Sequence, residues 1–414
     1  MTALALVLAA GLAAAAPLTE ADAVALALRS SPQLKAQGHF IDEATALTEV
    51  GLAWNNPHLR VQGLRYDELI GPAVDRRSYG DHPFYHTSIA LRWNPPGLGE
   101  RGARRAEGLA RETDARMEQA MARRDTTALV RKLHAEILSW DAEIALDREV
   151  IEQRAKLSAL VKSRVEQHAA TLLDESLAEV DYLDARTQLA EVEVRRRGAY
   201  DELLLQLGLP AGERVELVSS SATCTPPEEA TTLAERAHAA NPRLRILDAE
   251  DTAVDAELRR RWLNLVPWFD YAQVGYGMAG DTRPSYVAFE FQLTLPILDW
   301  KRPHRRALSA RHRALAERAY AEDRIVSDLV LRAAAAQTEQ AALVARYREA
   351  ASVVAGGLAR LREALEQGRI TNLFEVVQVQ ARLLATQRSY LHAQLECKLQ
   401  QIELDRITNR GVDP

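Results

Sequence analysis

The chain has 414 residues, of which 27% are charged and only 6% are aromatic. This composition is typical of long helices or coiled coils, and it argues against a β-sandwich or a doubly wound sheet. The net charge is −6, and the 52 basic residues are interleaved with 58 acidic ones, which excludes the concentrated basic surface of a nucleic-acid-binding protein.

The first sixteen residues (1–16) form a short apolar run that ends in Ala14, Ala15 and Ala16. Such a run is too short to span a bilayer, and its small terminal residues predict a secretory signal peptide. No later apolar stretch is long enough for a transmembrane helix. We therefore expect any membrane crossing to use strands.

The cysteines and histidines give little sign of a chemical centre. Cys224 and Cys397 are too few for a disulfide framework and lie far from any cluster of histidines, so we expect two free thiols, with a single structural disulfide as the alternative. The chain has no phosphate-binding loop and no nucleophile elbow. We predict no catalytic residues, no metal, no cofactor and no enzymatic activity.

An internal duplication organises the chain. The residues around Pro32 reappear around Pro242, at an offset of 210, and beyond the predicted strands Pro96 answers Pro296 at an offset of 200. The difference lies in the connection between the strands, where a surface loop tolerates a change of length. We predict a signal peptide at 1–16, a first structural repeat at 17–207, a linker at 208–229 and a second structural repeat at 230–414.

Each repeat has two predicted strands, at 58–68 and 85–94 in the first and at 268–279 and 285–295 in the second. In the last strand Val287, Phe289 and Phe291 alternate with polar or small residues, so one face is apolar. A half-buried strand of a soluble sheet has this pattern, and so has a membrane-crossing strand of about 9 to 11 residues. The tryptophans favour the membrane, because most of them flank the strands as in an aromatic girdle. These are Trp54, Trp93, Trp262, Trp268 and Trp300.

Long helices follow each pair of strands. The range 101–167 contains no proline and predicts a helix of roughly 100 Å. A second helix is predicted at 172–207, and its counterpart at 372–409. The short connections between long and second helices predict antiparallel hairpins. Apolar residues at steps of three, four and seven predict a coiled-coil seam in each hairpin. These are Val130, Leu133, Ile137, Trp140 and Ile144 in the first and Leu384, Leu391, Leu395 and Ile402 in the second.

Shorter helices precede the strands in both repeats. Thr19 is expected to cap the first of them, and Thr231 or Thr232 is expected to do so in the second repeat.

The order of elements, written twice, resembles that of the TolC-type outer-membrane factors. The segments that carry the resemblance are LTEADAVALALRSSPQLKAQ, SYVAFEFQLTLPILDWKRPHRRA and LEQGRITNLFEVVQVQARLLATQRSYLHA, and it extends from about Leu18 to Arg410. It implies a mainly α fold with a small β part, built from a duplicated strand–strand–long helix–helix unit. In the trimer it implies a 12-strand transmembrane β-barrel continued by a long periplasmic α-helical tunnel. Four strands cannot close a barrel alone, since the smallest membrane barrels use eight.

The resemblance also implies a function and partners. The chain would be the outer-membrane channel subunit of a tripartite efflux or type I secretion system, a passive conduit across the outer membrane of a Gram-negative bacterium. Its partners would be two further copies of itself, a periplasmic adaptor protein, an inner-membrane pump of the RND or ABC type, and outer-membrane lipid, with no nucleic acid. The family serves metal ions, drugs and secreted proteins alike, and such a conduit is largely indifferent to what its pump selects.

Two sets of residues are carried over from the family. A tip that contacts the adaptor is expected at the hairpin turns, although the first turn lacks the glycine of the pattern and tight turns alone would explain both. Acidic residues just past the tips are expected to face the pore and act as its gate, ordinary solvated carboxylates being the alternative. The tip residues are His168, Thr171, Gly368, Arg369 and Thr371, and the pore residues are Asp174, Glu175 and Glu375.

Basic residues cluster directly after the second strand of each repeat, in the ranges 101–105 and 301–306. They could contact lipid headgroups or simply begin the helices.

A soluble periplasmic coiled-coil adaptor (membrane fusion) protein is the alternative function, but adaptors carry one hairpin between compact β domains, whereas this chain duplicates both strands and helices.

Overall fold

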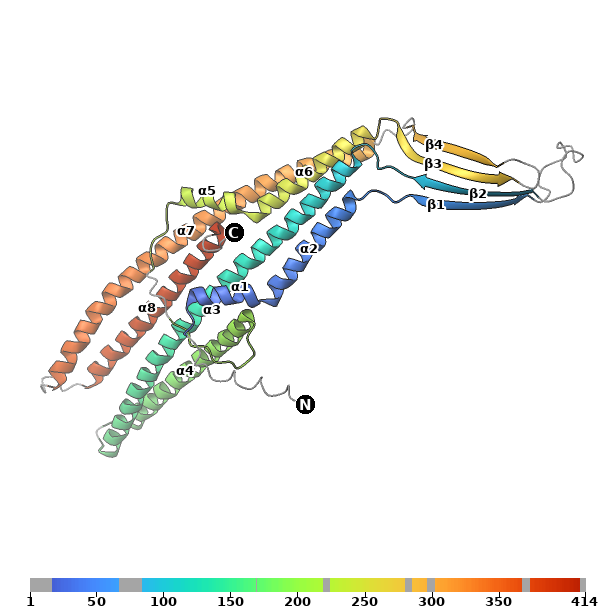
Figure 1. The fold of residues 1–414 in the computed structure, drawn as a ribbon. Coiled ribbons are helices and arrows are strands. Elements are labelled where there is room, and N and C mark those ends of the chain that lie inside the picture. Colours follow the sequence, from blue (N-terminus) through green and yellow to red (C-terminus); the bar gives the residue numbers. More distant parts are fainter. Residues whose placement is uncertain are drawn as a thin grey trace, which may run out of the picture. The chain divides into compact units, whose positions relative to one another are not determined.

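The computed structural model describes residues 17–66, 84–168, 170–218, 224–279, 285–295, 302–366 and 373–409, which are mainly helical with one small sheet (Figure 1). The predicted fold class, mainly α with a small β part, is confirmed. Among these residues no helix has an apolar stretch long enough, and poor enough in charge, to cross a membrane.

The twofold repeat of elements is present in the structure. The first repeat contains α1 (Glu20–Ser30), α2 (Pro32–Leu52), β1 (His58–Tyr66), β2 (Phe84–Trp93), α3 (Glu100–Glu166) and α4 (Leu172–Leu207). The second contains α5 (Ala230–Ala240), α6 (Pro242–Leu263), β3 (Trp268–Ala279), β4 (Tyr286–Thr294), α7 (Arg302–Glu366) and α8 (Leu373–Thr408).

Proline begins the second helix of each repeat. Pro32 and Pro242 are the first residues of α2 and α6, a position where a missing N–H costs nothing and the fixed φ suits a helix. Thr19 caps α1 as expected, in a capping box with Asp22. The expectation for α5 is wrong: its N-cap is Glu229 and makes no side-chain cap bond. Thr231 and Thr232 lie inside the first turn, because the helix begins soon after the Pro-Pro pair.

The described chain divides into two compact units, and each unit takes segments from both repeats. One unit comprises residues 1–38, 118–242 and 323–414, and the other comprises residues 39–117 and 243–322. The first is wholly helical in its regular elements, and the second contains the sheet and the helical segments that adjoin it in sequence. Each unit is described below by itself.

The helical unit contains two antiparallel hairpins, α3 with α4 and α7 with α8 (Figure 1). On α4 the residues Ala178, Ala185, Val192 and Ala199 are buried at intervals of seven, which is the spacing of a coiled-coil seam. On α3 the predicted seam is confirmed: Val130, Leu133, Ile137 and Ile144 are buried and Trp140 is partly buried. On α8 Leu384 and Ile402 are buried, while Leu391 and Leu395 are only partly buried.

The cores of the helical unit repeat the duplication in three dimensions. Ala23 and Ala27 of α1 pack with Val130 and Leu133 of α3. Their counterparts 210 or 200 positions later form a second cluster, in which Leu233 and Ala237 of α5 pack with Val330 and Ala333 of α7. Equivalent residues therefore make equivalent contacts in both repeats, as expected of two copies of one packing unit.

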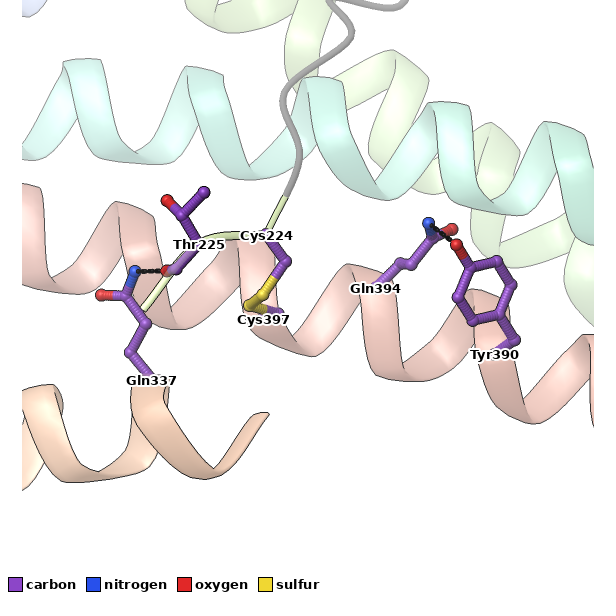
Figure 2. Close-up of a disulfide and its surroundings, with 6 residues drawn as sticks. All are labelled: Cys224, Thr225, Gln337, Tyr390, Gln394 and Cys397. Carbon is purple, nitrogen blue, oxygen red and sulfur yellow. Dashed lines mark hydrogen bonds between the residues drawn. A yellow bond between two sulfur atoms is a disulfide. The ribbon is translucent and has the colours of Figure 1, made fainter. Parts of the chain in front are cut away.

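Cys224 and Cys397 form a disulfide, so the expectation of two free thiols is wrong (Figure 2). Their Cα atoms are 6.1 Å apart although 173 positions separate them in sequence. The linker passes beside α8 at this point, and Gln337 Nε2 of α7 donates to the carbonyl of Thr225 at 2.9 Å. Cys397 is fully buried with Val344 and Ala393. The disulfide thus fixes the end of the linker to the second hairpin.

The sheet of the other unit is four-stranded and antiparallel, with strand order β1–β2–β3–β4. The central pairing of β2 with β3 joins the two repeats, and it sets Ile89 opposite Tyr276 and Leu91 opposite Val274. The strands have nine to twelve residues, and their limits agree with the predicted ones to within two residues. The outer edges of β1 and β4 pair with no strand among the described residues.

Candidate functional site: a two-faced sheet and the hairpin tip

One face of the sheet is apolar and exposed. The register aligns Val61, Ile89, Tyr276 and Val287 in one row across the four strands, and Leu59, Leu91, Val274 and Phe289 in the next. All eight are exposed, and Phe289, at the middle of β4, is 72% exposed. A soluble monomer rarely leaves a contiguous apolar surface of this kind uncovered. This face requires an apolar environment or a partner.

The opposite face is polar and internally hydrogen-bonded. The Nε of Arg92 donates to Gln273 Oε1 at 2.8 Å, and its guanidinium lies 3.7 Å from the centre of the Tyr271 ring. Gln273 Nε2 and the Tyr271 hydroxyl both donate to the carboxylate of Glu290. Three strands contribute to this network, and it leaves a hydrophilic surface directly behind the apolar one. A sheet with these two faces can separate an apolar medium from an aqueous one.

The alternation in β4 was predictable from the sequence, whereas the polar network was not predicted. The signal was present in β2, where Ser88 and Arg92 alternate with Ile89 and Leu91. What the sequence alone could not supply was the pairing of β2 with β3, which brings Arg92 to Gln273 across 181 positions.

Tryptophans gather where the strands meet the adjoining helices. Trp54 lies beyond the end of α2, Trp93 ends β2 and Trp268 begins β3, and the Trp54 and Trp93 ring centres are 5.8 Å apart. Trp262, near the end of α6, is stacked under the guanidinium of Arg305 at 4.0 Å. Amphipathic aromatic rings in one band are typical of a membrane interface. Trp300 lies outside the described residues.

The tip of the first hairpin is a capped turn. Thr171 is the N-cap of α4 and forms a capping box with Asp174, whose Oδ2 accepts from the Thr171 N–H at 2.9 Å and from its hydroxyl at 2.7 Å. His168 adopts φ +57°, a left-handed conformation that is common after helix ends and favours glycine. The counterpart of His168 at the offset of 200 is Gly368, so the residue that fits this conformation occurs in the second repeat.

The candidate gate residues are described only in part. The backbone hydrogen bond from Thr171, together with its hydroxyl, lowers the pKa of Asp174 below its ordinary value, so this exposed carboxylate is ionised near neutral pH. Glu175 follows it and is partly exposed. Gly368, Arg369 and Thr371 lie outside the described residues, and so does the side chain of Glu375. The structure therefore brings together Thr171 and Asp174 but does not test the remaining residues of the tip or gate.

A network of ion pairs links the two hairpins, and sequence analysis missed it. Arg131 of α3 donates to Glu20 of α1 at 2.6 Å and to Asp405 of α8 at 2.9 Å, and Lys398 of α8 contacts Glu20 at 2.9 Å. Burial alone would raise the pKa of Glu20, but the bonds from Arg131 and Lys398 outweigh it and lower that pKa. Arg388 of α8 adds contacts to two acidic residues of α3, Asp147 and Glu143.

Comparison with solved structures assigns the fold. The chain matches the outer membrane protein VceC of Vibrio cholerae with a TM-score of 0.75, at 13% identity over 95% of this chain and 97% of that one. A membrane protein from Pseudomonas aeruginosa gives 0.74 at 20% identity, covering 94% and 92%. The open-state MtrE outer membrane channel of Neisseria gonorrhoeae gives 0.72 at 14% identity, covering 95% and 89%.

Essentially the whole chain thus has the fold of the solved outer-membrane channel proteins, as its resemblance to the TolC-type factors implied. No family model matches the sequence, and no curated protein matches it. The likeness is therefore one of architecture, carried by a sequence that differs at most positions.

Proposed function

We propose that this chain is an outer-membrane channel subunit of a tripartite efflux or type I secretion system and acts as a passive conduit. The two-faced sheet carries the proposal. Its exposed apolar face suits lipid, its hydrogen-bonded polar face suits a water-filled lumen, and it occurs in a fold shared with outer-membrane channels.

The open edges of the sheet require several copies. In lipid, each unpaired backbone N–H or C=O costs several kcal/mol, so the outer edges of β1 and β4 must find partners. Pairing β1 of one copy with β4 of the next satisfies both edges. Three copies would bring twelve strands together, the 12-strand barrel that the resemblance implies, with the helical hairpins continuing as a periplasmic tunnel.

The remaining parts of the proposal concern location and partners. A duct has no energy source of its own, so a periplasmic adaptor and an inner-membrane pump of the RND or ABC type would supply it. The disulfide supports an oxidising compartment such as the periplasm. The proposed role requires no catalytic residue, cofactor or metal.

The decisive experiment measures the oligomer mass of the full chain in detergent and its conductance in a planar lipid bilayer. We expect a trimer that forms steady, cation-preferring pores. A monomer that dissolves without detergent and shows no conductance would reject the proposal and favour the periplasmic adaptor.

Within this proposal the hairpin tips engage the adaptor, through His168 and Thr171 in the first repeat and Gly368, Arg369 and Thr371 in the second. The support is their resemblance to the family pattern, together with the capped turn at Thr171. Cross-linking from a photoreactive residue at position 168 or 369 should capture the adaptor, whereas the same residue at position 191, on an exposed face of α4, should not.

The proposed gate consists of Asp174, Glu175 and Glu375, whose negative charges would attract cations in a narrow pore. Because the Asp174 carboxylate also belongs to the capping box of α4, Glu175→Gln and Glu375→Gln are the cleaner variants. Each should reduce cation preference, measured as the reversal potential in a salt gradient. Glu191→Gln is the matched control, since Glu191 is an exposed residue of α4 that pairs with Arg195. Equal reversal potentials in all variants would remove these residues from the gate.

A further inference from the structure

A cavity of about 570 Å³ lies in the sheet-containing unit, at the end of the sheet where β2 stops and β3 starts. Aromatic residues form much of its wall, and the loop between β2 and α3 closes one side. The aromatic lining residues are Trp54, Trp93, Trp268, Phe269 and Phe291. Its size and apolar character are those of small-molecule binding sites.

The cavity is continuous with the apolar face of the sheet. Ala272 and Phe291 are paired in the register, and Trp93 is opposite Ala272, so the three form the next row of that face beyond Leu91, Val274 and Phe289. All three also line the cavity. A hydrocarbon chain lying on the face could therefore enter the cavity without crossing a polar surface.

Arg101 contributes a charge to the wall of the cavity. It is the one charged residue among the described residues that line the cavity, and its guanidinium lies 4.6 Å from the centre of the Trp54 ring. One Nη donates to the carbonyl of Leu52 at 3.3 Å. A guanidinium has five N–H donors, so donors remain for an anion. No carboxylate pairs with Arg101 among the described residues.

The loop that closes the cavity is held in place. The indole N–H of Trp268 donates to the carbonyl of Pro96 at 3.1 Å, and the Gly97 N–H donates to Glu100 at 2.7 Å. Gly99 has φ +73°, and a Cβ there would lie 2.6 Å from a methyl of Leu263. The cavity wall is thus built into the fold, which favours specific binding over surface adsorption.

We propose that this cavity binds one phospholipid with an anionic headgroup, with an acyl chain against the aromatic wall and the phosphate on Arg101. The inference rests on the proposed function, because that function places the sheet in lipid. An apolar cavity beside a guanidinium that pairs with no carboxylate among the described residues matches the two-part chemistry of such a lipid. With this lipid site, the contact with the membrane extends from a general aromatic band to a defined binding site.

The test is native mass spectrometry of the full chain in a non-ionic detergent, titrated with phosphatidylglycerol or with phosphatidylcholine. We expect one phosphatidylglycerol retained per chain, in preference to phosphatidylcholine, and not displaced by inorganic phosphate. Arg101→Gln should weaken retention about tenfold, the loss expected when a charge-assisted bond is removed. Phe291→Ala should weaken both lipids alike.

Two variants serve as controls. Arg111→Gln removes an exposed arginine that pairs with Glu107 on the same helix. Arg305→Gln removes a second arginine that is stacked on a tryptophan, and Arg305 does not line the cavity. Both should bind phosphatidylglycerol like the parent chain.

Several outcomes would overturn the inference. Displacement by inorganic phosphate would indicate an anion site only, and equal retention of both lipids would indicate apolar binding only. A loss with Arg305→Gln equal to that with Arg101→Gln would indicate a diffuse basic band. Bilayer conductance of the same preparation separates the two proposals: pores without selective lipid retention refute the lipid site alone, whereas selective retention without pores refutes the channel and leaves the site.

Discussion

A charge placed on the apolar face of the sheet should prevent membrane insertion, whereas the same charge on the polar face should not. Phe289 and Ala288 are neighbours in the middle of β4 and lie on opposite faces. The 72% exposure of Phe289 means that Phe289→Arg removes few contacts inside the subunit, so folding of the isolated chain should change little. Ala288→Arg is the matched variant, because Ala288 pairs with Gly275, which leaves room beside it.

The expected magnitude comes from the cost of an arginine on a lipid-facing strand, about 2–4 kcal/mol near the bilayer midplane. If the assembly contains three copies, the cost is paid in each, about 6–12 kcal/mol in all on the same scale. Such a penalty is comparable to the whole free energy of unfolding of an ordinary domain.

The assay is the fraction of each variant that reaches the outer-membrane pellet, together with bilayer conductance per mass of protein. Phe289→Arg should lose both, and Ala288→Arg should keep both with an altered ion preference. Equal behaviour of the two variants would show that the exposed apolar face does not meet lipid.

Three further predictions concern the helical unit. Replacing Cys224 and Cys397 by serine, or reducing the disulfide, should destabilise the unit by about 2–4 kcal/mol because the loop that it closes is long. The serine variant and the reduced chain should therefore denature at a lower midpoint than the untreated, oxidised chain, and unchanged midpoints would contradict this. The first turn of α4 should fray in acid: the folded pKa of Asp174 is lowered, so its stabilisation is present above the ordinary value of 3.8 and is lost as the pH falls through the folded value. Hydrogen exchange of that turn should show the loss, and Thr171→Ala should abolish its pH dependence. His168→Gly should stabilise the turn by about 0.5–1 kcal/mol, since it removes the strain of φ +57° at a smaller entropic cost; lower stability of this variant would contradict the assignment.

The elements were largely predictable because the repeat supplies each pattern twice. Pro32 and Pro242 marked equivalent places in the two halves, and the period of two in β4 set its faces. The cap of α5 was not predictable from Thr231, because the choice of first turn depends on where the linker leaves the preceding prolines. Local sequence patterns thus predicted a helix boundary correctly only where a single candidate residue was present.

The candidate site was predictable to a smaller extent. The apolar face follows from alternation within a strand, but the polar network needs Arg92 and Glu290 brought together through β3. The disulfide and the Arg131 network likewise join residues more than a hundred positions apart. Such contacts depend on tertiary packing, and the periodicity within a single element does not predict them.

The pairing of β2 with β3 has a consequence for the order of folding. Each hairpin, β1–β2 and β3–β4, can form from neighbouring segments, but an isolated hairpin is marginal in water. The ladder between them closes a loop of about 180 residues, from Trp93 to Ala272, and long loops close late and slowly. We expect the amides of the first hairpin to remain incompletely protected until the second repeat has been synthesised. Pulse-labelled hydrogen exchange would show this as amides of β2 gaining protection only together with those of β3, and earlier protection of β2 alone would contradict it. Because the unit is duplicated, the β1–β2 hairpin exists for an interval without its β3 partner, and its unpaired edge is open to aggregation during that interval.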